Sequence, residues 1–297
     1  DVLKIGYGSD VTQLILFIFV FAALIEEAGL SKGLAMFFVT RKCFMGKPWL
    51  FSFILLFAAY LLSAATSTIA AIIICWSITY KICTQIGYKP GDTWPKIMTF
   101  GIVLACTLGL SLFPFKSVPL VVLGAYTTLS DIHISFLSYV CFSAPMGILA
   151  VLLYTMLCKL VFRPDVSNLK NLSLDNFDPE DRNIKFSKEQ KIDLMFLMAM
   201  IVLLLVPSIL PSEWGITKLL VNIGATGTII FIIALMCFLT YNRKPLLDFK
   251  KMATGIQWDV VVLTATILPL ASFITSDSTG IIPFLTKILN PIFQGKP

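Results

Sequence analysis

Two groups of polar residues lie inside apolar stretches of this sequence, where they could bind a ligand. The first is Ser63-Ala-Ala-Thr66-Ser67-Thr68, in the middle of the apolar segment 49–80. The second is Lys116, which stands between Pro114 and Pro119 in the apolar segment 97–128. Hydroxyl groups and the backbone N–H groups at a helix N-terminus attract anions, and a buried ammonium does the same. These residues therefore predict the binding of an anion, and they imply no making or breaking of covalent bonds.

Each group also has a structural interpretation. Serine and threonine cap helices and bond back to carbonyl groups within kinked spans, so residues 63–68 could serve only the backbone. A lysine in the middle of a membrane costs at least ~2.5–3.5 kcal/mol, so Lys116 needs a compensating interaction. It could pair with an acid on another helix. Alternatively, its ammonium could take the place of a bound cation, so that an anion binds with little or no sodium.

The composition places the elements that carry these residues in a membrane. Hydrophobic residues make up 57% of the chain and charged residues 13%, and the mean hydropathy is +0.88. These values are typical of multispanning membrane proteins, whose spans need roughly 20 apolar residues each. The net charge of +6 comes from basic residues in short loops, which indicates topology signals and not a nucleic-acid partner. Besides the two segments above, apolar stretches occur at 11–30, 134–162, 193–210, 216–241 and 258–276.

The expected fold is an all-α polytopic membrane protein, because lipid cannot satisfy open backbone groups and no segment alternates like a barrel strand. The segments 49–80 and 97–128 are too long for one regular span. In the first, the Ser/Thr group predicts two half-helices that meet at a polar tip; in the second, Gly109 and the two prolines predict another break.

The charges of the loops predict the topology. If the segment 49–80 dips into the membrane and returns, all strongly basic loops fall on one side, which the positive-inside rule makes cytoplasmic. If it crossed once, the loop 31–48 would lie opposite the other basic loops. We therefore expect a re-entrant hairpin in a multi-pass protein of the cell (plasma) membrane. The predicted cytoplasmic loops are 31–48, 81–96, 163–192 and 242–257.

Similarity between two stretches of the chain predicts an inverted repeat. The stretch from Leu14 to Phe38 resembles that from Val260 to Leu289, and the predicted topology runs them in opposite directions. Inverted repeats are the usual build of secondary transporters, with the site near the midplane where the repeats meet. We expect residues 1–162 to form the first repeat, 163–192 a solvated cytoplasmic linker, and 193–297 the start of a second repeat. The partner of the first hairpin is expected beyond Pro297.

The order of these elements resembles the divalent anion:sodium symporter family of the ion transporter superfamily. The resemblance rests on Glu26-Glu-Ala-Gly29-Leu30-Ser-Lys-Gly-Leu34-Ala35, followed by a basic loop, an apolar half-helix and a Ser/Thr-rich tip. In that family, two re-entrant hairpins with Ser-Asn-Thr tips bind sodium and substrate carboxylates in a homodimeric elevator transporter. Ser63 matches the tip serine, whereas Ala64 and Ala65 replace the asparagine and the threonine. Phe113, Phe115 and Lys116 depart from the small, polar character of the second break.

The resemblance implies a set of site residues, no organic cofactor, and sodium as a possible coupling ion. The implied partners are a small anionic substrate, the lipid bilayer and a second copy of the chain. The expected substrate-binding residues are Ser63, Thr66, Ser67, Thr68, Pro114 and Lys116, and the expected cation-binding residues are Ser63, Ala65, Thr107, Gly109 and Ser111.

The sequence thus predicts a secondary transporter of a small anion, most plausibly a di- or tricarboxylate, that works by alternating access. Alternatives within the superfamily are an inorganic-anion transporter and a cation/proton antiporter. The antiporter would need carboxylates deep in the bundle, and Glu26 and Glu27 are expected at the membrane interface, near the end of their span. A channel stays possible, because broken helices also line pores. The His-Glu-x-x-His motif of intramembrane metalloproteases is absent from the sequence.

Overall fold

The computed structural model describes residues 2–89, 91–130, 134–177, 186–211, 213–241, 244–276, 279–281 and 284. Within them, six helices are long and apolar enough to cross a membrane, or up to eight if each of two bent helix pairs counts as one span. The one pairing of strands in these residues joins β1 (Thr240–Tyr241) to β2 (Lys244–Pro245). The predicted all-α polytopic fold is confirmed.

The α-helices follow the apolar stretches of the sequence closely. Their bounds are α1 Val2–Gly6, α2 Asp10–Glu27, α3 Leu30–Val39, α4 Pro48–Ala65, α5 Thr68–Gln85, α6 Thr93–Leu110, α7 Ser117–Ser130, α8 Phe136–Leu157, α10 Lys188–Ile209, α11 Gly215–Phe238, α12 Phe249–Met252 and α13 Trp258–Thr275. Short 3-10 or π segments are η1 Lys42–Phe44, η2 Cys158–Phe162, η3 Asn168–Asn171, η4 Leu174–Asn176 and η5 Ala253–Gly255.

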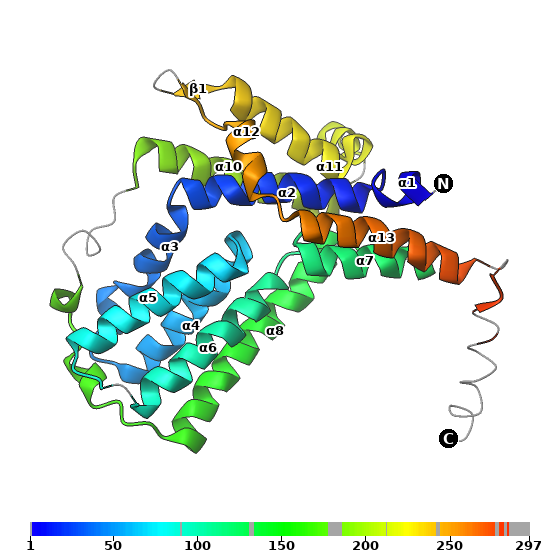
Figure 1. Cartoon of the computed structure of the whole chain (residues 1–297). Helices are drawn as coiled ribbons and strands as arrows, with labels where there is room; N and C mark the ends of the chain where they lie inside the picture. The colour runs from blue at the N-terminus through cyan, green and yellow to red at the C-terminus, as the bar shows by residue number, and fades with distance from the viewer. Residues whose placement is uncertain are drawn as a thin grey trace.

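The helices pack around two hydrophobic cores. The first core is formed by α3, α4, α5, α6 and part of α8, with Trp94, Tyr60 and Phe51 among its largest buried side chains. The second core is formed by α2, α10, α11, the start of α13 and the residues around α7. Figure 1 shows the first group of helices as one bundle, with α2, α7 and α13 side by side along its edge. The two breaks predicted from sequence lie where these groups meet.

The segment 49–80 forms a helical hairpin whose tip is the Ser/Thr group. Helix α4 ends at Ala65 and α5 starts at Thr68, and the two helices pack against each other and against α6 (Figure 1). Thr66 ends α4, because its backbone is extended, and its Oγ1 donates to the carbonyl of Leu62 at 2.8 Å. The predicted break is therefore confirmed. Each arm has 18 residues and is about 27 Å long, which is longer than a half-helix and close to a full span. That the tip stops inside the membrane stays a prediction.

The segment 97–128 is also broken as predicted. Helix α6 ends at Leu110 and α7 begins at Ser117, and the residues between them turn tightly with Leu112, Pro114 and Phe115 buried. Gly109 allows α6 to lie directly on the hairpin: a Cβ at this position would be 2.1 Å from the carbonyl oxygen of Tyr60 in α4. This close approach fixes the second break beside the tip.

Two sequence predictions about loops are wrong. Residues 31–39 of the predicted loop 31–48 belong to α3, because Ala35, Met36 and Val39 make an apolar face that packs on α4. The predicted solvated linker 163–192 is packed up to residue 177, since Leu169, Leu172 and Phe177 are buried in the first core. Residues 178–185 of that linker, and residues 242 and 243 of the predicted loop 242–257, lie outside the described residues.

Three glycines mark bends of the backbone. Gly29 and Gly280 occupy corresponding places in the predicted inverted repeat, and both have a φ of +65°. Helices α2 and α3 meet at Gly29 with a bend of 65°, so the predicted first span, residues 11–30, corresponds to α2 and ends at this bend. Gly224, with φ 74° and ψ 171°, interrupts α11, a break that sequence analysis missed. The shared conformation of Gly29 and Gly280 agrees with the repeat, which stays a prediction.

Candidate functional site

A cavity of about 320 Å³ opens between the two groups of helices, at the tip of the α4–α5 hairpin. One wall is a face of α2 that runs from Ile18 to Glu26, and the opposite wall is the tip, Thr66 to Ile69. The second break contributes Lys116 and Ser117, and the segment before α13 contributes Gly255 and Gln257. The cavity is therefore built from both breaks, the first span and the second half of the chain.

Lys116 joins the two breaks. Its side chain is 9% exposed, and its Nζ donates a hydrogen bond to the backbone carbonyl oxygen of Thr66 at 2.6 Å. The carboxylate of Glu26, on another wall of the same cavity, attracts the ammonium. Lys116 thus places a positive charge beside the end of α4 and the start of α5. The structure supports both interpretations of Lys116. Its ammonium lies near the acid Glu26, as expected for a buried pair, and it also contacts a carbonyl oxygen that could bind a cation, as expected if it replaces one.

The start of α5 is the second feature of the site suited to an anion. Ser67 is the residue before the helix, and the first N–H groups of an α-helix have no partner within it. The positive end of the helix dipole lies at the same place, which favours negative charge. Thr66, Ser67 and Thr68, three of the predicted substrate-binding residues, line the cavity, and their contact with a substrate stays a prediction.

Glu26 is the residue of this site that sequence analysis missed. Its Oε1 accepts a hydrogen bond from the backbone N–H of Ser67 at 3.1 Å, although the prediction put it at the membrane interface. A signal was present in the sequence. Ile18, Ala22 and Glu26 recur at four-residue spacing and so share one face of α2, where small residues leave room for a cavity beside a carboxylate.

Ser63 lies behind the cavity wall and supports the tip. It is fully buried, and its Oγ lies 2.6 Å from the carbonyl oxygen of Cys106 in α6 and 3.1 Å from Oγ1 of Thr68. Pro114 is buried in the second break and is not among the residues that line the cavity. For these two residues the structure shows packing and hydrogen bonding, and their substrate contact stays a prediction.

The residues predicted to bind a cation are only partly brought together. Ser63 and Gly109 are neighbours, because a Cβ on Gly109 would be 3.1 Å from Cβ of Ser63. Ala65 lies beside Lys116 along a smaller cavity behind the tip. The hydroxyl of Thr107 donates to the carbonyl of Val103 in its own helix, on an exposed face. Ser111 is exposed, and its carbonyl accepts from the hydroxyl of Tyr139. A cation site at Thr107 and Ser111 stays a prediction.

Comparison with known families identifies the kind of protein. A family model for citrate transporters matches residues 2–295, nearly the whole chain. The chain belongs to the citrate transporter family. No curated protein shows a significant match to the chain. Membership in the citrate transporter family confirms the prediction of an ion transporter family, and the finer resemblance to the divalent anion:sodium symporters stays a prediction.

The cavity is consistent with the citrate transporter family in its chemistry. A carboxylate-binding site needs cationic side chains and oriented N–H donors, and the cavity holds both in Lys116 and the start of α5. Among the described residues, no group of three or more His, Cys, Asp or Glu side chains is arranged to hold a metal ion. Gln257 adds an uncharged polar side chain from the second half of the chain.

Proposed function

We propose that the protein carries citrate, or a related di- or tricarboxylate, across the membrane by alternating access, and that carboxylate groups bind in the cavity between Lys116 and the start of α5. The observation that carries this proposal is the contact of Lys116 with the hairpin tip, which puts a fixed positive charge next to helix N–H donors. The cavity has a volume of about 320 Å³, which suits a small organic anion, since small-molecule sites occupy roughly 300–1,000 Å³.

The two cores suggest how access could alternate. The hairpin and α6 belong to the first core, whereas α2 belongs largely to the second, so the cavity walls come from different packing units. A rigid-body movement of the first unit against the second would carry the bound anion past α2, as in an elevator. A second copy of the chain would provide a fixed frame for this movement. The homodimer and the elevator movement are parts of this proposal.

The contact of Lys116 also bears on the coupling ion. Its ammonium donates to the carbonyl oxygen of Thr66, which is the neighbour of Ala65 in the expected cation-binding set and could otherwise bind a sodium ion. We infer that the lysine replaces a coupling cation at this position. Citrate would then bind with less dependence on sodium than the resemblance to sodium symporters implies.

One observation favours a different function. Glu26 places a carboxylate in the cavity, and a cation/proton antiporter of the same superfamily would use such a group to exchange ions. In proteoliposomes, an antiporter moves cations in response to a pH gradient without any citrate. Citrate transport instead requires uptake of labelled citrate that saturates and that shows counterflow, which also separates a carrier from a channel.

The test compares uptake of labelled citrate by the wild type and by Lys116→Met in proteoliposomes. We expect the variant to lose roughly 10- to 100-fold in citrate affinity, since a hydrogen bond to a charged group contributes about 1.5–3 kcal/mol. The control is Lys159→Met, which changes an exposed lysine at the end of α8. Citrate uptake by Lys116→Met with wild-type affinity would contradict the proposed site, and an absence of citrate uptake by the wild type would contradict the function.

A further inference from the structure

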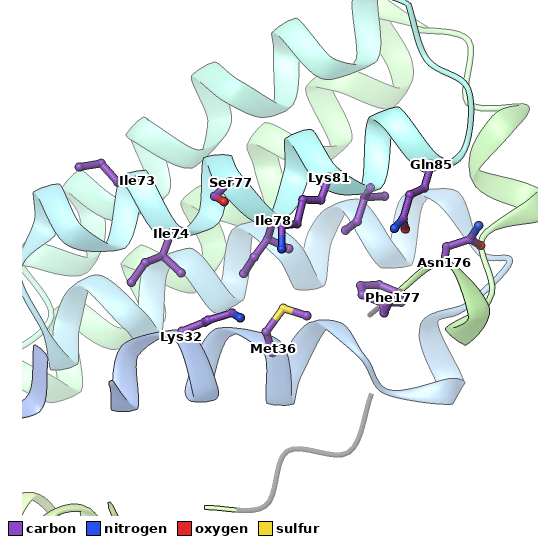
Figure 2. A pocket seen from close by; sticks show the side chains of 11 residues that line it. Lys32, Met36, Ile73, Ile74, Ser77, Ile78, Lys81, Gln85, Asn176 and Phe177 are labelled. Atoms are coloured by element: carbon purple, nitrogen blue, oxygen red, sulfur yellow. The ribbon is translucent and has the colours of Figure 1, made fainter. Parts of the chain in front are cut away.

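A second cavity, of about 210 Å³, lies between α3 and α5, along the arm of the hairpin that leads away from the tip. Figure 2 shows its two walls: Lys32 and Met36 lie on α3, and Ile74, Ile78 and Lys81 lie on α5. Phe177, from the packed part of the linker, closes one end. We call this cavity the α3–α5 groove. It shares no lining residue with the cavity at the hairpin tip, which we call the citrate cavity after its proposed substrate.

The groove combines two positive charges with an apolar floor. The side chains of Lys32 and Lys81 extend into the space between the helices from opposite walls (Figure 2). Each ammonium carries three N–H donors, so one phosphate can accept from both lysines in addition to their other contacts. Met36, Ile74 and Ile78 supply apolar surface directly beside these charges. A ligand that fits the groove therefore has an anionic group joined to hydrocarbon.

The outer face of α5 extends this apolar surface. Ile69, Ile73, Trp76 and Tyr80 are exposed and follow each other at spacings of four, three and four residues, so they form one stripe along the helix. Ile73 belongs both to the stripe and to the groove. A hydrocarbon chain that leaves the groove can therefore lie along α5. This continuity favours a membrane lipid over a free anion in solution.

The position of Lys32 and Lys81 in the chain also favours a membrane lipid as the ligand. Lys32 and Lys81 begin the two basic segments that the charge pattern predicts on the cytoplasmic side. The cytoplasmic leaflet contains anionic lipids, and each lysine near its surface strengthens binding about fivefold.

From these observations we propose that the α3–α5 groove binds an anionic glycerophospholipid, with its phosphate between Lys32 and Lys81 and an acyl chain along the stripe on α5. The lipid would bridge α3 to the outer arm of the hairpin. This proposal does not depend on which substrate the citrate cavity binds.

Native mass spectrometry of the purified protein tests the proposal with phosphatidylglycerol and phosphatidylcholine that carry the same acyl chains. We expect the wild type to retain phosphatidylglycerol preferentially, and Lys32→Gln/Lys81→Gln to bind it about 25-fold more weakly, as two lysines at about fivefold each imply. The matched control is Lys89→Gln/Lys96→Gln, which removes the same charge from exposed positions outside the groove. Lys32→Arg/Lys81→Arg should restore the preference.

Three results would overturn the proposal. In the first, the wild type binds the two lipids equally well. In the second, the groove variant Lys32→Gln/Lys81→Gln does not bind phosphatidylglycerol more weakly than the control variant Lys89→Gln/Lys96→Gln does. In the third, glycerol 3-phosphate competes fully with phosphatidylglycerol at equal concentration, which would identify a site for a free anion.

Discussion

The Oε1 atom of Glu26 accepts a hydrogen bond from the backbone N–H of Ser67, 3.1 Å away, and so joins α2 to the tip of the α4–α5 hairpin. This N–H belongs to the residue that precedes α5, where the proposed function puts a substrate carboxylate. The carboxylate of Glu26 therefore lies where a carboxylate of the substrate could also bind. The neighbouring Glu27 instead forms an ion pair with Lys251. Two adjacent acids thus have different partners, one inside the cavity and one outside it.

Substitution Glu26→Gln should strengthen citrate binding. The amide oxygen can still accept from Ser67, but the negative charge that faces the substrate is gone. Two unit charges a few ångströms apart repel by roughly 1 kcal/mol in a water-filled cavity, so we expect the citrate dissociation constant to fall about fivefold. Isothermal titration calorimetry measures this change. Glu27→Gln is the matched control, since it removes the same charge from the adjacent residue. Equal effects of both variants would argue against a specific role of Glu26.

The contact between Gly109 and the carbonyl of Tyr60 should make Gly109 intolerant of a side chain. In Gly109→Ala the new Cβ would lie 2.1 Å from a backbone oxygen, which cannot rotate away. We expect the free energy of unfolding to fall by about 1–3 kcal/mol, as for other overpacked sites. Thermal unfolding followed by intrinsic fluorescence reports the loss. In the control Gly215→Ala, no described residue beyond the neighbouring turn of the same helix lies within 4 Å of the added methyl group, so a similar loss there would discredit the explanation by close packing.

Sodium dependence tests the proposed replacement of a coupling cation by Lys116. If the ammonium of Lys116 replaces a coupling cation at Thr66, citrate uptake should continue at a similar rate when choline replaces sodium on both sides of the membrane. The measurement is initial uptake into proteoliposomes at matched pH and membrane potential. Strict dependence of the wild type on sodium would refute the replacement of a cation by Lys116.

The sequence predicted the breaks well, because their chemistry is local. Serine and threonine in the middle of an apolar stretch, and two prolines around Lys116, disfavour a continuous helix whatever lies around them. The packed end of the linker was not predictable in this way. Leu169, Leu172 and Phe177 are scattered among polar residues, and only the first core shows that they are buried.

The site was predicted in part for the same reason. The tip and Lys116 are unusual in their own segments, so the sequence singles them out, whereas Glu26 looks like an ordinary acid at a helix end. Its role comes from a contact with the backbone N–H of Ser67, 41 residues away in the chain, and the sequence offers only the indirect signal that Ala22 and Glu26 share one face of α2. For Thr107 the resemblance implied a cation ligand; its hydroxyl donates to the carbonyl of Val103 in its own helix, and cation binding there stays a prediction.

The last prediction concerns the depth of the hairpin tip. Each arm is about as long as a membrane span, so length alone does not decide whether the tip stops inside the membrane or reaches its far side. In a background whose only other cysteine is Cys43, which is exposed near the start of α4, we expect Ser67→Cys to react with a small methanethiosulfonate reagent and citrate to slow this reaction. Citrate should leave the reaction of Cys43 unchanged, because that residue lies outside the cavity. A bulky polyethylene glycol maleimide should not reach position 67 from either side. If it modifies position 67 from the side opposite to Cys43, the hairpin crosses the whole bilayer and the re-entrant topology is wrong.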